Sequence, residues 1–145
     1  MKATLTDKVF GKLEWDEDSE TYCGTVKFPP DPAVEFVLVV NNADETSASE
    51  LKAFLSAARQ HFEKLRQDDS AYRKRAALVV SKALKKEGKG VAEQLRLQKI
   101  QIDNAGITML YYDTCGLLPV KQRYVGIALD MSGTIHLARV MRNPE

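Results

Sequence analysis

The 145-residue chain carries 21 basic and 20 acidic residues, so its formal net charge is only +1. This balance gives no global reason to expect nucleic acid or a membrane surface as its partner. Hydrophobic residues make up 44% and charged residues 28%, as is typical of a soluble globular protein, and the length predicts a single domain over residues 1–145. A chain of this size buries roughly 68–70% of its unfolded surface and needs no metal or disulfide to hold its core.

Cysteine usage and the lack of targeting signals predict a cytoplasmic protein. Cys23 and Cys115 are the only cysteines and have no paired spacing, which suits a reducing compartment. The first residues contain no apolar segment of a signal peptide. The longest apolar run covers residues 36–40, far short of the roughly 20 residues that a membrane-spanning helix needs.

The first part of the chain predicts three strands. Residues 9–15 and 22–28 flank a polar turn at residues 16–19 and indicate a β-hairpin, which three prolines then end. Residues 34–40 are apolar on both faces. Such a strand lies in the middle of a sheet or has its second face covered.

The middle of the chain predicts two consecutive amphipathic helices. Ser47 and Glu50 have the spacing of a capping box. Residues 68–70 interrupt the apolar pattern and offer a new N-cap, while Gly88 and Gly90 indicate the end of the second helix. Apolar residues at steps of three and four form one stripe per helix: Leu51, Phe54, Leu55, Ala58, Phe62 and Leu65, then Tyr72, Ala76, Val79, Val80 and Ala83.

The last part of the chain predicts four further strands. Residues 91–97 fit either a short helix or the start of a strand. Because the apolar alternation slips before Ile100, an unbroken strand there needs a bulge. The predicted elements are two hairpins, formed by residues 100–102 with 107–112 and by residues 124–129 with 134–140, and the loop of residues 113–121 that connects them.

The order of elements is therefore β-β-β-α-α-β-β-β-β. Runs of strands and then helices favour an α+β fold over an alternating βαβ fold. The sequence predicts an antiparallel sheet of about six or seven strands, with the two consecutive helices packed on one face.

Three parts of the chain carry a resemblance to small bacterial families catalogued only as domains of unknown function. They are the opening hairpin with Phe10-Gly11-Lys12-Leu13-Glu14-Trp15 and Tyr22-Cys23-Gly24, the helical pair, and Tyr111-Tyr112-Asp113 followed by Val125-Gly126-Ile127-Ala128-Leu129-Asp130 and Gly133-Thr134-Ile135. Some such families carry a Gly-His pair in the loop after the Asp, where this chain has Cys115-Gly116-Leu117. The resemblance covers nearly the whole chain. It implies proteins that are not established enzymes, some of them partners of bacterial toxins or defence systems.

No residue pattern indicates a catalytic, cofactor or metal site. We interpret His61 and His136 as surface or half-buried structural residues, although a fold that brought them together would permit a shared site. The cysteines and histidines lack metal-ligand spacing, and the acidic residues 16–20 lack the pattern of a calcium loop. The glycine motifs of nucleotide sites are also absent from the sequence.

The second helix and its exit have a local excess of positive charge. The excess fits contact with phosphates or with an acidic protein surface. A solvated helix face is the favoured interpretation, because no stacking aromatics or recognition motif accompany the charges. The cations are Arg73, Lys74, Arg75, Lys82, Lys85, Lys86 and Lys89, with Glu87 as the counter-charge.

We therefore predict a non-catalytic bacterial interaction protein, an immunity or accessory protein that binds one macromolecular partner without a cofactor. The hypothetical partner-binding residues are Arg73, Lys74, Lys82 and Lys85. One alternative is nucleic-acid binding through the same face. The other is an enzyme with its site in the loop of residues 113–121, using Tyr112, Asp113 or Cys115. The oligomeric state and the identity of the partner stay open.

Overall fold

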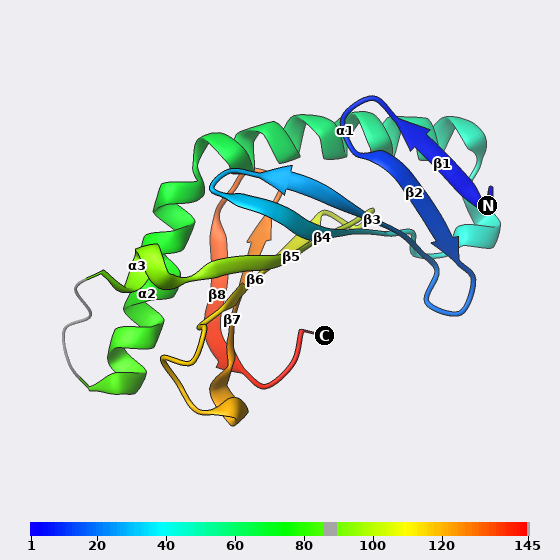
Figure 1. The fold of residues 1–145 in the computed structure, drawn as a ribbon. Helices are drawn as coiled ribbons and strands as arrows, with labels where there is room; N and C mark the ends of the chain where they lie inside the picture. Colours follow the sequence, from blue (N-terminus) through cyan, green and yellow to red (C-terminus); the bar gives the residue numbers. More distant parts are fainter. Residues whose placement is uncertain (86–89, 145) are drawn as a thin grey trace.

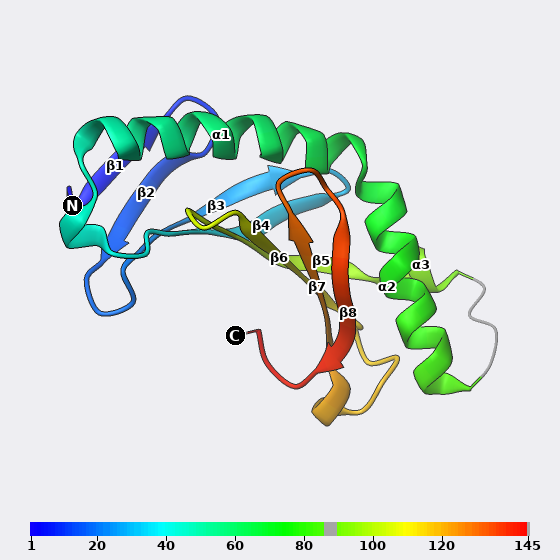
Figure 2. The same ribbon diagram turned by 180° about the vertical axis from the view of Figure 1, so that it is seen from behind.

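The strand and helix signals combine into one eight-stranded sheet with two long helices on one face (Figures 1 and 2). The computed structural model describes residues 1–85 and 90–144. The elements are β1 (Thr4–Asp7), β2 (Gly11–Asp16), β3 (Thr21–Phe28), β4 (Asp31–Val39), the short helix η1 (Ala43–Glu45), α1 (Ala48–Gln67), α2 (Asp69–Leu84), α3 (Val91–Gln94), β5 (Arg96–Asp103), β6 (Ile107–Asp113), the short helix η2 (Val120–Gln122), β7 (Tyr124–Asp130) and β8 (Ile135–Met141).

The predicted α+β class is confirmed, and the strands follow sequence order across the sheet. Neighbouring strands are antiparallel except β4 and β5, which run parallel. The chain between these two strands passes through α1, α2 and α3, which is the kind of crossover that a parallel pair requires. The sheet therefore consists of two antiparallel halves that meet at the β4–β5 pair, whereas the sequence predicted antiparallel pairing throughout.

Strand β1 is an element that the sequence pattern did not indicate, and it raises the number of described strands above the predicted six or seven. It has only four residues and one apolar side chain, Leu5, which lies opposite Leu13 of β2. A segment this short shows no alternation of its own. Pairing with β2 is what makes it a strand.

The core lies between the helices and the facing side of the sheet. The ring of Phe62 on α1 lies 5.4 Å from that of Phe10 and 5.7 Å from those of Phe28 and Phe36. These are edge-to-face contacts, which add to the gain from burial. The buried residues of the two helices mostly belong to the predicted stripes: Leu55, Ala58, His61, Phe62 and Leu65 on α1, and Tyr72, Arg73, Ala76 and Val80 on α2.

The centre of the sheet matches the sequence pattern closely. Phe36 and Val37 of β4 point to opposite faces and are both buried, as predicted for a strand that is apolar on both sides. Residues 91–97 form both predicted alternatives in succession, because α3 leads directly into β5. A register shift between Leu97 and Lys99 supplies the predicted bulge.

The helix boundaries follow local signals at three ends out of four. The capping box of Ser47 and Glu50 is present. Asp68 is both the C-cap of α1 and the N-cap of α2, as the interrupted pattern predicted. The second helix ends earlier than expected, at Leu84, and its C-cap residue Lys85 adopts the left-handed conformation with φ 57°. The predicted stop at Gly88 lies outside the described residues, and Gly90 begins α3 instead.

The turn between β7 and β8 ties the helices to the end of the sheet. Lys64 Nζ donates to the carbonyl of Ser132 at 2.5 Å, and the Tyr72 hydroxyl donates to the carbonyl of Gly133 at 3.1 Å. These bonds hold the junction of α1 and α2 against the turn. From there α2 packs along β7 and β8 (Figure 2).

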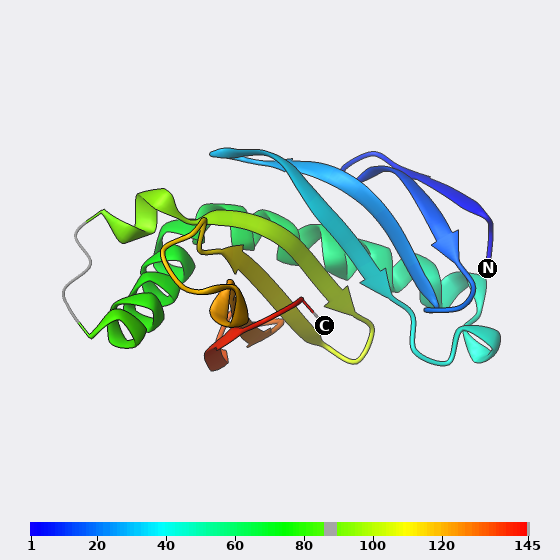
Figure 3. The same cartoon turned by 60° about the horizontal axis from the view of Figure 1, so that its bottom comes forward.

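The two edges of the sheet are formed by β1 and β8. Figure 3 shows the strands in front of α1, which packs on their far face. Within the described ranges, no helix is long and apolar enough to cross a membrane.

Candidate functional site

Arg73 does not belong to an exposed basic surface, which corrects the set of contact residues predicted from the sequence. Arg73 is only 7% exposed. Nη2 contacts Asp31 Oδ2 at 2.8 Å, Nε contacts Asp69 Oδ2 at 3.2 Å, and Nη1 donates to the Leu95 carbonyl at 2.7 Å. The guanidinium therefore joins α2 to β4 and to the chain entering β5.

The environment of Arg73 keeps it charged. Burial by itself would lower its pKa, but the hydrogen bonds to Asp31 and Asp69 outweigh burial and raise it. The guanidinium also lies 5.3 Å from the ring centre of Tyr112, a cation–π contact. A signal for this burial exists in the sequence, because Arg73 precedes Ala76 by three residues and Val80 by seven and therefore shares their stripe.

The other cations of the predicted surface are exposed: Lys74, Lys82 and Lys85, with Arg75 beside them. Leu78 lies among them on α2 and is 57% exposed. A single exposed leucine on a helix is common in soluble proteins and by itself does not mark an interface. Contact of these lysines with a partner stays a prediction.

The position of Arg75 and Lys82 around α2 follows from the contacts of two neighbouring residues. Tyr72 reaches the β7–β8 turn, whereas Arg73 reaches β4 on the opposite side. A step of three residues falls about 60° short of a full turn, so Arg75 lies beyond Tyr72 on the side away from Arg73. Lys82 lies two turns further along, nearly in line with Arg75. We call this pair the basic flank of α2; it lies beyond Tyr72, on the side of the helix away from Arg73.

Strand β8 is an unprotected edge next to this flank. Among the described strands it pairs only with β7, and it extends over seven residues. Leu137 is 48% exposed, and Ile135, Ala138 and Val140 are only partly buried. By contrast, the opposite edge, β1, is short and mostly polar, which is a common way to block pairing with another chain.

The loop of residues 113–121 does not assemble an activated nucleophile. Cys115 is exposed, and its pKa is raised by partial burial and by the nearby carboxylate of Asp113. A catalytic thiolate needs the opposite shift. Asp113 accepts a hydrogen bond from the Cys115 backbone N–H at 2.8 Å and pairs with Arg123 at 3.1 Å. Tyr112 is buried, and burial together with Asp69 raises its pKa well above the usual value.

The two histidines lie in different environments, and among the described residues only His136 contacts a carboxylate, that of Asp130. His136 is exposed and its Nε2 lies 2.8 Å from Asp130 Oδ2. His61 is only 3% exposed, more buried than predicted, and its Nε2 lies 2.8 Å from the hydroxyl of Thr108. Asp130 accepts from Ser132 and His136, and these bonds hold its pKa far below the usual range. Asp130 thus lies between the Ser132 hydroxyl and His136, whereas in a catalytic triad the histidine lies between the hydroxyl and the carboxylate.

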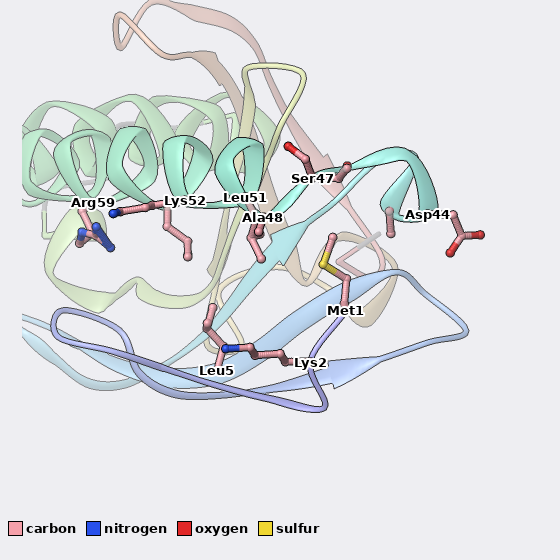
Figure 4. Close-up of a pocket in the computed structure, with 12 residues that line it drawn as sticks. Met1, Lys2, Leu5, Asp44, Ser47, Ala48, Leu51, Lys52 and Arg59 are labelled. Carbon is pink, nitrogen blue, oxygen red and sulfur yellow. The ribbon is translucent and has the colours of Figure 1, made fainter.

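A groove between β1 and the start of α1 is a site that the sequence did not indicate (Figure 4). Its volume is about 720 Å³, within the usual range for small-molecule sites. Leu5 and Lys2 face Leu51 and Lys52 across it, with Arg59 at one end. These residues come from elements that are distant in the chain, so no local pattern marks the groove.

Comparison with known proteins gives no indication of which candidate site is functional. No family model, curated protein or solved structure matches the chain. Among the described residues, no group of three or more histidine, cysteine, aspartate or glutamate side chains could hold a metal ion.

Proposed function

We propose that this protein is a non-catalytic binding protein that recognises one protein partner through the open edge of β8. An extended segment of the partner adds to the sheet as a further strand beside the basic flank of α2. The observation that carries the proposal is that a long, partly apolar edge strand lies next to exposed cations. The narrower role of an immunity or accessory protein stays a prediction.

The edge of β8 supports binding of a strand because its outer backbone groups have no strand partner among the described residues. Strand addition supplies main-chain hydrogen bonds, and side chains on alternate residues supply specificity. Ile135, Leu137 and Val140 offer partly exposed apolar contacts to such a strand. An added strand would cover surface that β8 leaves open to water.

The charges on α2 favour an acidic partner over a second copy of this chain. Arg75 and Lys82 are exposed on the side of α2 that carries Tyr72 toward the β7–β8 turn, and in this proposal they border the added strand. Two copies that pair through β8 would bring their basic flanks together, and like charges at an interface oppose binding. A segment with glutamate or aspartate on alternate residues would be attracted instead.

Nucleic acid fits the same surface less well. The middle of the exposed face is occupied by Leu78 rather than by an aromatic residue, whereas binding of single strands usually relies on base stacking. Because Arg73 is buried, the exposed surface of α2 also carries less positive charge than the sequence predicted.

A synthetic peptide of about ten residues with alternating valine and glutamate tests the proposal. We expect it to bind and to slow amide exchange in β8, and a peptide of alternating valine and lysine to bind much more weakly. The double variant Arg75→Glu, Lys82→Glu should weaken binding by about tenfold or more. The matched control, Lys8→Glu with Lys27→Glu, makes the same charge change at exposed positions away from β8.

Three results would contradict the proposal. They are no binding of the acidic peptide, binding that leaves exchange in β8 unchanged, or equal effects of the two double variants. Tight binding of an oligothymidine with a steep dependence on salt, in the absence of peptide binding, would favour nucleic acid.

A further inference from the structure

The groove between β1 and α1 has opposed apolar walls. Leu5 of β1 lies on one side and Leu51 of α1 on the other. Leu55 of α1 also lines the groove. Leu5 and Leu51 pack against the core but keep part of their surface exposed. An apolar chain placed between the walls would remove this surface from water, which is favourable in proportion to the area covered.

Cationic side chains border the same groove. Lys52 and Arg59 line the groove from α1, with the Lys52 nitrogen directed along the helix toward Arg59, and Lys2 lies on the side of β1 (Figure 4). Among the described residues that line the groove, Asp44 is the carboxylate, and it lies at the far end from Arg59. The groove therefore combines apolar walls with a positively charged border.

One of these cations is already fixed in place. Arg59 Nη1 lies 2.6 Å from Asp7 Oδ1, and the other oxygen of Asp7 accepts backbone N–H groups of Val9 and Phe10. Arg59 is thus positioned but largely neutralised. Among the described residues, Lys52 has no ion pair, so the border keeps positive charge for an anion.

The lining distinguishes between classes of small ligand. No aromatic side chain is among the described lining residues, so the groove offers no surface for stacking a base or another flat ring. Its hydroxyl groups are those of Thr46 and Ser47, and the Ser47 oxygen is engaged by the backbone N–H of Glu50. A ligand rich in hydroxyl groups would find few partners, whereas an unbranched apolar chain with one anionic end matches both parts of the lining.

We propose that this groove binds a single free fatty acid, with its acyl chain between Leu5 and Leu51 and its carboxylate at Lys52. The site lies at the β1 edge of the sheet, whereas the proposed partner surface lies at β8. It is therefore independent of the proposed function, and either proposal can fail without the other.

Calorimetric titration with dodecanoate, below the concentration at which it forms micelles, tests the site. We expect one molecule to bind per chain and to shift the methyl resonances of Leu5, Leu51 and Leu55. Dodecyltrimethylammonium has the same chain with a positive end and should bind at least tenfold more weakly, a difference of about 1.4 kcal/mol.

Two variants separate the charge of the site from its shape. Lys52→Glu should weaken dodecanoate binding by about tenfold or more, and Ala48→Trp should block the groove, since Ala48 is exposed and lines it. Lys27→Glu is the matched control on β3 and should bind like the original protein. None of the three should alter binding of the acidic peptide at β8.

Several outcomes would overturn the assignment. They are no binding of dodecanoate at about 1 mM, equal binding of the two amphiphiles, or an unchanged affinity in both Lys52→Glu and Ala48→Trp. Binding to phosphatidylglycerol vesicles without binding of dodecanoate would also overturn it, because the ligand would then be a membrane surface.

Discussion

His61 is a titratable group held inside the core. Its ring bonds to Thr108 and lies close to Lys64 and Asp130. Burial, followed by the charge of Lys64, lowers its pKa from the ordinary 6.5, and Asp130 and the backbone of Met131 only partly oppose this shift. The folded protein therefore holds His61 neutral at a pH where the unfolded chain takes up a proton.

This difference predicts a loss of stability in mild acid. Below about pH 6.5 the unfolded chain binds more protons at His61 than the folded protein does, so the free energy of unfolding falls until the pH reaches the lower folded pKa. The slope reaches at most about 1.4 kcal/mol per pH unit. His61→Gln keeps a polar group toward Thr108 but does not titrate, so urea unfolding between pH 7 and 5 should show a shallower slope.

Gln60, which is exposed on α1, provides the control for this prediction. Gln60→Ala removes no titratable group and should leave the slope between pH 7 and 5 close to that of the original protein. Equal slopes in the His61→Gln variant and the original protein would show that burial of His61 does not control the acid response. The folded pKa of Asp7 is also lowered, but from 3.8, so its contribution is lost at lower pH.

At the scale of the element, the start of α1 is the clearest local signal. Ser47 Oγ accepts the backbone N–H of Glu50 at 3.1 Å, and Glu50 Oε1 accepts that of Ser47 at 3.3 Å. The two bonds satisfy N–H groups that the first turn of the helix leaves open. They fix where a helix of 20 residues begins.

Removing this cap should weaken the protein by a measurable amount. Ser47→Ala is expected to lower the free energy of unfolding by about 1 kcal/mol, as measured by urea denaturation at pH 7. Ser56→Ala, at an exposed position inside α1, should be neutral or slightly stabilising because alanine has the higher helix propensity. A loss in Ser56→Ala as large as in Ser47→Ala would mean that the cap contributes nothing specific.

At the scale of the whole molecule, the sheet has a protected centre and two different edges. The parallel pair β4 and β5 lies in the middle, with three strands on each side of it. Edge β1 is short and polar, whereas β8 is longer and partly apolar. Amide exchange follows local opening, which is costly at a buried centre and easy at an edge.

We therefore predict a gradient of amide exchange across the sheet. In dilute solution, the amides of β4 and β5 should exchange slowest, and the outward-pointing amides of β8 should exchange among the fastest of any strand. Hydrogen exchange followed by NMR measures this order directly. If β8 were as protected as β5, and lost that protection on dilution, a second copy of the chain would already cover the edge.

Short-range patterns explain the parts of the fold that the sequence determined. The capping box, the helix stripes and the hairpins depend on residues a few positions apart, and their physical chemistry is nearly the same in any fold. The α+β class follows from their order. The bulge near Leu97 was also predicted, because a change in the alternation of apolar and polar residues is a local property of the sequence.

Only the tertiary structure decided the features that depend on distant residues. The parallel pairing of β4 with β5 needs the whole helical crossover, and β1 becomes a strand only through β2. Arg73 looked like a surface cation because its partner, Asp31, is 42 positions away in the chain. The groove and the position of the basic flank could not be predicted for the same reason. Each depends on how distant elements pack together, and their residues share no local sequence pattern.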